Sequence, residues 1–391
     1  MANTLKFGNG QWASKEGSVL AYNDENNNFK PLPFDFTRAS GATRVNKDGL
    51  IEVVGSDEPR IDFSNDANGA LLLEPSRSNL VSYSEDFSQS AWVKTGLSVN
   101  SNQIISPDGT LNADEVNISA ANSHYLFYSI SVSALTNYTF TFYVKKGTAT
   151  DASYSILNET NFTNIVNTTS YFNEISDTNW TRISVEFTTP SGATSIRVYP
   201  LRDGSSTGTV YIYGTQLEES SYATSYIPTS GAAVTRVADV CNNGGNNQVI
   251  NSTEGVLYFE GSALVDETKQ RWISLGSGSN ANRVSILFNA TSRISCSVRA
   301  SSSALYDANF NIGSQTNYTK AAIRYKNNDF AFFVNGVKAN SQLSGTLSFN
   351  SPLSELAFDS ADSGSPFYGK TSQIQVFTTA LTDQELIALT S

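Results

Sequence analysis

Residues 330–338 read FAFFVNGVK and decide the fold class of this chain. An apolar run ends at Asn335 and Gly336, and Asn-Gly is the pair that a two-residue type I′ turn prefers, because both of its central positions need positive φ. The stretch therefore predicts a β-hairpin. Further strand-length segments rich in β-branched and aromatic residues precede it, at 255–261, 271–275, 284–288 and 321–325.

A period of two also marks the earlier part of the chain, where apolar and polar residues alternate over 138–144, 181–187, 195–199 and 209–213. Strands at this spacing indicate an antiparallel sandwich. The 22 Phe, 18 Tyr and 4 Trp, with only 16% charged residues, favour strands over long helices. A single core stops growing near ~250 residues, so a chain of 391 residues suggests two domains.

We therefore predict an all-β protein in which an extended N-terminal adaptor precedes two antiparallel β-sandwiches, the first of them a jelly roll. The Asn- and Gly-rich run VCNNGGNNQVINST reads as the linker between the sandwiches. The predicted boundaries are 1–78 for a docking arm and adaptor, 79–239 for the first sandwich, 240–253 for the linker and 254–391 for the second sandwich.

Charge and composition exclude several classes of protein. A net charge of -11 argues against a nucleic-acid partner, because the phosphate backbone must be met by a basic surface. Cys241 and Cys296 are far apart in sequence and have no metal-ligand spacing, so neither a zinc site nor a disulfide framework is indicated. The sequence begins without a signal peptide and has no run of ~18 apolar residues, so we expect cytoplasmic synthesis and no membrane insertion.

Residues 1–33 are rich in Asn and Gly and carry isolated aromatic residues, among them Phe7 and Trp12. Such a segment cannot bury enough apolar surface to offset its ordering entropy, so we expect it to order only against a partner or another copy of itself. The next stretch, 33–80, has strand-sized segments between turn signals and evenly spread arginines, and it reads as an adaptor.

Four anchors in this adaptor, FTRAS (36–40), GLI (49–51), PRID (59–62) and LLLEPSRSNL (71–80), resemble the N-terminal part of tailed-bacteriophage head-fibre and tail-fibre proteins. The resemblance implies a virion structural protein that is assembled in the host cytoplasm, contacts other virion proteins and forms a homo-oligomer, often a trimer in fibres. The candidate docking residues are Phe7, Trp12, Phe36, Arg38, Arg60 and Arg77. The alternative is that these arginines pair with nearby carboxylates such as Asp35, Glu58, Asp62 and Glu74.

The closing run of the first sandwich, GTQLEESSYATSYIPT (214–229), resembles the ending of the jelly-roll carbohydrate-binding modules found in phage fibres. The resemblance implies sugar binding, for which Trp92, Tyr125 and Trp180 are the candidate stacking residues; the alternative is that they belong to the core. It also implies a possible calcium ion at Asp86 and Glu218, although Tyr213 to Gln216 stand where paired aspartates would be expected, which leaves too few oxygen ligands.

The end of the chain, GKTSQIQVFTTALTDQEL (369–386), contains a capping box formed by Thr382 and Glu385, which predicts one short helix. Together with the hairpin, this ending resembles the concanavalin A-like, laminin-G-type lectin fold, which serves lectins, enzymes and structural domains alike. The candidate ligand residues are Asn282 in loop 280–283 and Asp359 and Asp362 in loop 359–364; the alternative is that both loops are solvated turns.

Catalysis would need a nucleophile with a base, a carboxylate pair or a metal site. One His and two separate Cys offer neither a triad nor a zinc site, and no strand of the second sandwich carries paired acidic residues, so we expect no enzyme. The leading interpretation is a fibre or decoration subunit of a virion that contacts surface glycans through its sandwiches. Two alternatives stay open: a structural virion linker or base without glycan binding, and a bacterial surface adhesin, which the lack of a signal peptide disfavours.

Overall fold

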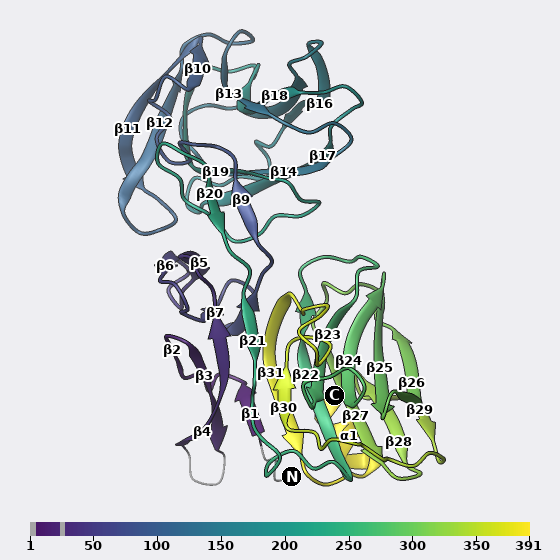
Figure 1. Ribbon diagram of the computed structural model, residues 1–391. Helices are drawn as coiled ribbons and strands as arrows, with labels where there is room; N and C mark the ends of the chain where they lie inside the picture. Colours follow the sequence, from purple (N-terminus) through teal and green to yellow (C-terminus); the bar gives the residue numbers. More distant parts are fainter. Residues whose placement is uncertain (1–4, 24–27) are drawn as a thin grey trace. The chain divides into compact units, whose positions relative to one another are not determined.

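The computed structural model describes residues 5–23 and 28–391, and its strands form antiparallel sheets as predicted (Figure 1). The chain divides into two compact units. We call Met1–Gly49, Val54–Pro75 and Val237–Ser391 the composite unit, and Leu50–Val53 with Ser76–Arg236 the inserted unit. The all-β class is confirmed, but the N-terminal segment belongs to a sandwich instead of forming a separate adaptor.

Three sheets build most of the composite unit, with strand orders β29-β28-β27-β22-β31-β8-β7, β26-β25-β24-β23-β30 and β2-β3-β4-β21; β1 lies beside β31. The strands of the first sheet are β1 (Leu5–Gly8), β7 (Arg60–Asp62), β8 (Ala70–Leu73), β22 (Glu254–Ala263), β27 (Thr319–Lys326), β28 (Phe330–Val334), β29 (Val337–Gln342) and β31 (Gly369–Phe377). Those of the second are β23 (Arg271–Gly276), β24 (Arg283–Ala290), β25 (Arg293–Ala300), β26 (Ser303–Asn311) and β30 (Glu355–Ala357). Those of the third are β2 (Ser14–Lys15), β3 (Ser18–Asn23), β4 (Asn28–Thr37) and β21 (Val240–Asn242). The short strand β5 (Ala42–Val45) also belongs to this unit, whereas most of β6 (Ile51–Val54) belongs to the inserted unit.

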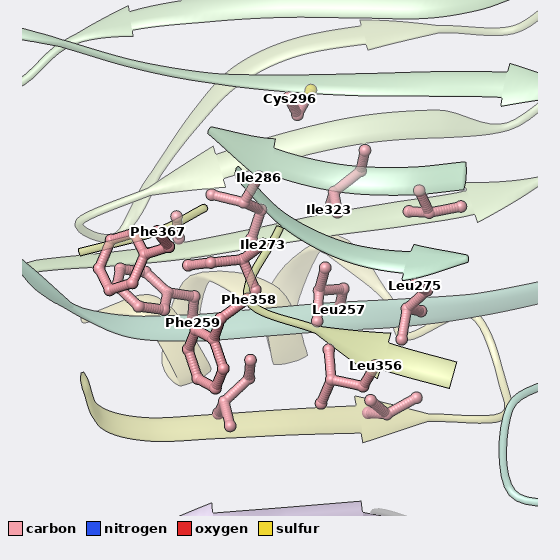
Figure 2. Packing of buried hydrophobic residues seen from close by; sticks show 14 of the residues in the cluster. Leu257, Phe259, Ile273, Leu275, Ile286, Cys296, Ile323, Leu356, Phe358 and Phe367 are labelled. Carbon is pink, nitrogen blue, oxygen red and sulfur yellow. The ribbon is translucent and has the colours of Figure 1, made fainter. Parts of the chain in front are cut away.

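Apolar side chains from the first two sheets meet in one core. Figure 2 shows Leu257 and Ile323 from the first sheet together with Ile273, Ile286 and Leu356 from the second. Each of these side chains is excluded from water, which supplies most of the free energy that holds the two sheets together.

The predicted hairpin is confirmed. Val334 pairs with Val337, and between them Asn335 and Gly336 have φ of 48° and 76°, as a type I′ turn requires. The capping box is also present: Thr382 and Glu385 begin the helix α1 (Asp383–Thr390). Within the described part of the chain, no helix is long and apolar enough to span a membrane.

The described N-terminal residues are part of the core, so the prediction of a separate docking arm is wrong. Leu5 pairs with Val376 across β1 and β31, and the ring of Phe7 lies 4.3 Å from that of Phe34. The predicted linker is also structured, since β21 pairs with β4 and Ile250 is buried in the same core. A few apolar residues among the Asn and Gly are enough to order these segments, because the two large sheets of the composite unit supply the rest of the core.

The inserted unit is a sandwich of two five-stranded sheets, with orders β10-β13-β18-β15-β16 and β11-β12-β19-β14-β17. The chain passes repeatedly from one sheet to the other, as in a jelly roll. Its described boundaries, Ser76 and Arg236, are close to the predicted 79 and 239. The strands of the two sheets are β10 (Trp92–Thr95), β11 (Leu97–Ile105), β12 (Leu111–Ile118), β13 (Tyr125–Ser131), β14 (Asn137–Lys146), β15 (Ser153–Asn158), β16 (Thr163–Ser170), β17 (Thr181–Thr188), β18 (Ser195–Arg202) and β19 (Gly208–Glu218). A separate two-stranded sheet pairs β9 (Arg77–Asn79) with β20 (Val234–Arg236).

Candidate functional site

An aromatic cluster lies outside the sandwich core on strands β13, β15 and β18 of the first sheet of the inserted unit; Figure 1 labels β13 and β18. Successive strand residues point to opposite faces. Leu126 and Ile196 therefore enter the sandwich core, whereas Phe127 and Tyr199 form a second cluster with Leu157 outside it.

Three rings of this cluster touch one another. The ring centroids of Tyr125 and Tyr199 are 6.3 Å apart at 87°, and those of Phe127 and Tyr199 are 5.1 Å apart at 46°. These are separations and tilts at which aromatic quadrupoles attract. The rings are thus held rigidly against the sheet by one another.

Two guanidinium groups cover these rings. The Cζ atom of Arg197 lies 4.5 Å from the ring centroid of Phe127, and that of Arg202 lies 4.7 Å from the ring centroid of Tyr199. The planar guanidinium stacks on an aromatic ring and keeps its N–H groups pointing sideways, where they can donate hydrogen bonds. We call Tyr125, Phe127, Tyr199, Arg197 and Arg202 the aromatic–arginine face.

Each arginine of this face is held in place by polar partners. Arg197 Nε donates to Glu159 Oε1 at 2.8 Å, and Arg202 Nη1 donates to Ser155 Oγ and Asn164 Oδ1, both at 3.1 Å. Partial burial opposes the charge of Arg197, but the hydrogen bonds and charge of Glu159 outweigh it and raise the pKa of the guanidinium. Phe127 and Tyr199 are themselves buried, at 6% and 4% exposed, whereas Tyr125, Arg197 and Arg202 are half-buried. The part of the face that solvent reaches therefore consists of the ring of Tyr125 and the fixed, planar donors of the two arginines.

The structure separates the three predicted stacking residues. Tyr125 belongs to the aromatic–arginine face, half-buried. Trp92 is 1% exposed in the sandwich core and donates from Nε1 to the carbonyl of Tyr83, so its prediction as a ligand residue is wrong. Trp180 packs in a different cluster, where its Nε1 donates to the carbonyl of Ile105 at 3.0 Å.

Sequence reasoning missed Phe127, Arg197 and Arg202 as site residues. The alternation in 195–199 already places Arg197 and Tyr199 on one side of their strand. It does not indicate whether that side faces the core or the solvent, because both sides of this strand carry large residues.

Arg38 and Arg60, two of the three arginines predicted to dock, are buried among carboxylates, so the docking prediction is wrong for them. The alternative holds for Arg60, which pairs with Glu74, but the carboxylate that both arginines share is the distant Asp239. Arg60 Nη1 lies 2.5 Å from Glu74 Oε2, and its Nη2 donates to Asp239; Arg38 Nη1 lies 3.1 Å from Asp239 Oδ1. Arg38 Nη2 also donates to the carbonyl of Gly55 at 2.6 Å. Burial opposes the charge of Arg60, but Asp239 and Glu74 raise the pKa of its guanidinium above the usual value.

The remaining docking candidates also serve the fold. Phe7 and Phe36 are buried core residues, which rules out a docking role. Trp12 packs against the same core and donates from Nε1 to the carbonyl of Gly69 at 3.0 Å. Arg77, in the inserted unit, lies over the ring of Tyr222 with its Cζ 5.4 Å from the centroid.

The structure does not bring Asp86 and Glu218 together. Residues 80–84 run antiparallel to residues 215–217: the amide of Leu80 donates to the carbonyl of Leu217, and the amide of Thr215 donates to the carbonyl of Ser84. Asp86 follows one end of this pairing and Glu218 follows the other end, so the two carboxylates are kept apart. In residues 5–23 and 28–391, no three His, Cys, Asp or Glu side chains are grouped so that they could hold a metal ion. These residues therefore do not fit a shared calcium ion.

Asp86 instead lines an acidic cavity of about 400 Å³ in the inserted unit, together with Glu85 and Asp114. Asp114 is fully buried and accepts hydrogen bonds from the amides of Phe87 and Asn102, at 2.9 and 3.0 Å. Burial outweighs these bonds and raises the pKa of Asp114 to about 6. Burial also raises the pKa of Glu85, despite the hydroxyl groups that donate to it.

This shift predicts how the stability of the inserted unit changes with pH. The pKa of Asp114 is higher in the folded state than its ordinary value of 3.8, which applies to the unfolded state, so the folded state holds the proton more tightly. The unfolding free energy therefore falls as pH rises from about 4 to about 6. Asp114→Asn removes the ionisation while keeping an acceptor. We expect the unfolding free energy of the variant, relative to the unsubstituted protein, to increase by about 2–3 kcal/mol between pH 4 and pH 7. Urea titrations at both pH values measure this, and an unchanged difference would contradict it.

The two candidate loops of the composite unit do meet, because Asn280 Nδ2 donates to Asp362 Oδ2 at 2.8 Å. Asn282 is buried and bonds Asn350 and the amide of Ser301, so its role is structural. Asp359 is also buried, and it accepts from the amide of Ala361 at 2.7 Å, within its own loop. Only Asp362 of the three predicted ligand residues is exposed.

The comparisons with known proteins define the class of the second sandwich. The family model described as the concanavalin A-like lectin/glucanases superfamily matches residues 263–387. The chain therefore contains a concanavalin A-like domain, which lies in the composite unit, and the predicted resemblance is confirmed for that domain. No curated protein matches the chain.

Several solved structures are similar to part of the chain. The CBM40 of the IT-sialidase of Ruminococcus gnavus, bound to α2,3-sialyllactose, is 17% identical with a TM-score of 0.32, covering 37% of this chain and 85% of its own. Domain 4 of AbnA, an extracellular arabinanase from Geobacillus stearothermophilus in complex with arabinotriose, is 15% identical with a TM-score of 0.33, covering 44% and 81%. The enzymatically active domain of tailspike protein 4 of bacteriophage CBA120 is 16% identical with a TM-score of 0.28, covering 36% and 21%. Similarity at this level supports no statement about the ligands of this chain.

Proposed function

We propose that this chain is a non-catalytic glycan-binding protein and that the aromatic–arginine face is its binding surface. The observation that carries the proposal is the position of three mutually packed rings outside the sandwich core, with two stacked guanidinium groups over them. The half-buried ring of Tyr125 beside planar donors held in place by the two buried rings suits a sugar, which has apolar C–H surfaces and many hydroxyl groups. The concanavalin A-like domain is consistent with a carbohydrate ligand, although this fold serves other functions too.

The state of the reactive side chains supports a non-catalytic role. His124, the sole histidine, is buried, with Nδ1 2.8 Å from the carbonyl of Ala120 and Nε2 accepting from the amide of Gly204 at 3.2 Å. Both cysteines are buried, which raises the pKa of each thiol well above its usual value. None of these three groups is placed to attack or deprotonate a substrate.

The wider role that we propose is that of a fibre or decoration subunit of a virion, assembled as a homo-oligomer. The support is the string of adaptor anchors between residues 36 and 80 in the sequence. Many copies on one particle would turn weak contacts between each face and a glycan into durable attachment. Because Arg38 and Arg60 are buried, attachment to the particle would have to use other residues. The two alternative roles are a virion linker or base without glycan binding, and a surface adhesin. No observation favours either of them over this proposal.

A glycan array tests the proposal with a matched pair of variants. Arg197 and Arg299 both lie on strands, pair with a carboxylate and have similarly exposed side chains, at 26% and 24%, but only Arg197 belongs to the face. We expect the full-length protein, clustered on beads, to bind at least one glycan. Arg197→Gln should weaken that binding about tenfold, as expected for a charge-assisted hydrogen bond, and Arg299→Gln should leave it unchanged.

Two results would count against the proposal. If the clustered protein bound no glycan on the array, the role in glycan attachment would be overturned. If both variants bound equally well, the aromatic–arginine face would be the wrong surface.

A further inference from the structure

The hairpin that joins β15 to β16 places an aromatic residue in an unfavourable conformation. Asn158 pairs with Thr163, and Phe162 stands just before the second strand with φ of 58°. This left-handed region suits Gly and Asn, whose side chains are absent or can bond the local backbone, and it is strained for a bulky side chain. Local folding therefore favours a different residue at position 162.

Phe162 is also unfavourably exposed, since 66% of its surface is open to solvent. Contact between an apolar ring and water is unfavourable, and burying the ring would increase the unfolding free energy of the protein. The same residue thus carries two separate disadvantages for folding, one in its backbone and one in its side chain. Strained positions of this kind often occur at functional sites.

The position of Phe162 next to the aromatic–arginine face gives it a role. Arg197 stacks on Phe127 with its Cζ 4.5 Å from that ring, and the same Cζ lies 5.4 Å from the ring of Phe162. The guanidinium therefore connects the inner rings to Phe162, which extends the face at its rim. A cation–π contact at an exposed site is worth too little to explain the residue by itself.

Charge at the face limits the chemistry of a ligand. Arg197 Nη2 lies 2.7 Å from Glu159 Oε1, and Arg202 Nε lies 3.2 Å from Asp203 Oδ2. Each guanidinium thus has its own carboxylate, and these two pairs add no net charge. An anionic sugar would meet Glu159 and Asp203 as well as the two arginines, so the face favours a neutral ligand.

We propose that Phe162 is a ligand-contact residue on which the apolar C–H surface of a neutral pyranose ring stacks. This inference rests on the proposed glycan-binding function and names the ligand class and the residue that selects it. The ring of Phe162 supplies a flat apolar surface, while Arg197 beside it donates to sugar hydroxyl groups.

A substitution that separates folding from binding tests this inference. Phe162→Asn relieves the strained conformation and removes the exposed ring, so the variant should be at least as stable as the unsubstituted protein towards urea. Its affinity for whichever neutral polysaccharide the unsubstituted protein binds should nevertheless fall roughly tenfold, the effect expected for a lost aromatic contact. Phe162→Tyr keeps the ring and should retain binding. The probes for affinity electrophoresis of the full chain are laminarin, galactan and mannan, with polygalacturonate as an anionic comparison.

Leu135 provides a matched control in the same unit. It also has a left-handed φ, of 56°, and is 73% exposed, but it is not part of the aromatic–arginine face. Leu135→Asn should therefore change stability in the same direction as Phe162→Asn and leave binding unchanged.

Each other outcome identifies the statement that fails. If the unsubstituted protein bound none of the four polysaccharides but did bind a glycan on the array, this inference would be overturned and the proposed function would stand; no binding in either assay would overturn both. If it bound and Phe162→Asn bound equally well, only the role of Phe162 would be overturned. A loss of both stability and binding in Phe162→Asn would make the residue structural, and binding to polygalacturonate alone would overturn the neutral ligand class.

Discussion

Arg60→Met is expected to lower the unfolding free energy of the composite unit by about 3–5 kcal/mol, the range measured when one partner of a buried ion pair is removed. The guanidinium of Arg60 is fully buried between Glu74 and Asp239. Methionine fills much of the same volume, so packing changes little, but two buried carboxylates lose a shared cation. Asp239 still has Arg38, whereas Glu74 is left without the ion pair that it makes with Arg60. Urea unfolding of the full chain, followed by circular dichroism, measures the loss.

An exposed ion pair provides the control for Arg60. Arg299 Nη1 lies 2.8 Å from Asp307 Oδ1, but Asp307 is largely open to solvent. Water screens such a pair, so Arg299→Met should change the unfolding free energy by less than about 1 kcal/mol. A loss below 1 kcal/mol for Arg60→Met as well would contradict the buried network.

Phe7→Ala is expected to destabilise the composite unit by about 3–5 kcal/mol, as large-to-small changes in a packed core do. Phe7 lies on β1 beside β31 and is 1% exposed, with its ring against that of Phe34. Truncation to alanine removes the buried ring and leaves a cavity that its rigid neighbours cannot fill. The shift in the urea midpoint of the full chain measures the effect.

Leu343→Ala is the matched control for Phe7. Leu343 is 78% exposed in the same unit, so its truncation removes little buried area and should change stability by less than about 0.5 kcal/mol. Equal and small effects of both changes would mean that β1 is not part of the core and would restore the view of residues 1–33 as a docking arm.

These two results bear on the role of the adaptor anchors. Arg38 lies in FTRAS, Arg60 in PRID and Glu74 in LLLEPSRSNL, and all three meet at or beside Asp239. Spread along the sequence they resemble a set of contact residues, but in the fold they form one buried network. Arg38, Arg60 and Glu74 therefore mark a structural element of the composite unit.

Local features of the chain were readable from sequence alone. The Asn-Gly turn after Val334 and the capping box at Thr382 depend on residues within a few positions of one another, so their residue types suffice. Period-two alternation likewise indicated the strands of both sandwiches and an all-β class, because it reflects a repeating property of the extended backbone.

The position of each side chain in the whole molecule was decided only by tertiary structure. Arg60 donates a hydrogen bond to Asp239, which lies 179 positions further along the chain. Phe7 is a core residue because β1 pairs with β31. The outward side of β18, which exposes the stacked Arg197, and the burial of Trp92 likewise depend on which sheets pack together. Burial and ion pairing follow from the summed packing of strands that are distant in sequence. A short stretch can therefore specify a strand or a turn, but it cannot specify which of its side chains remain available to a ligand.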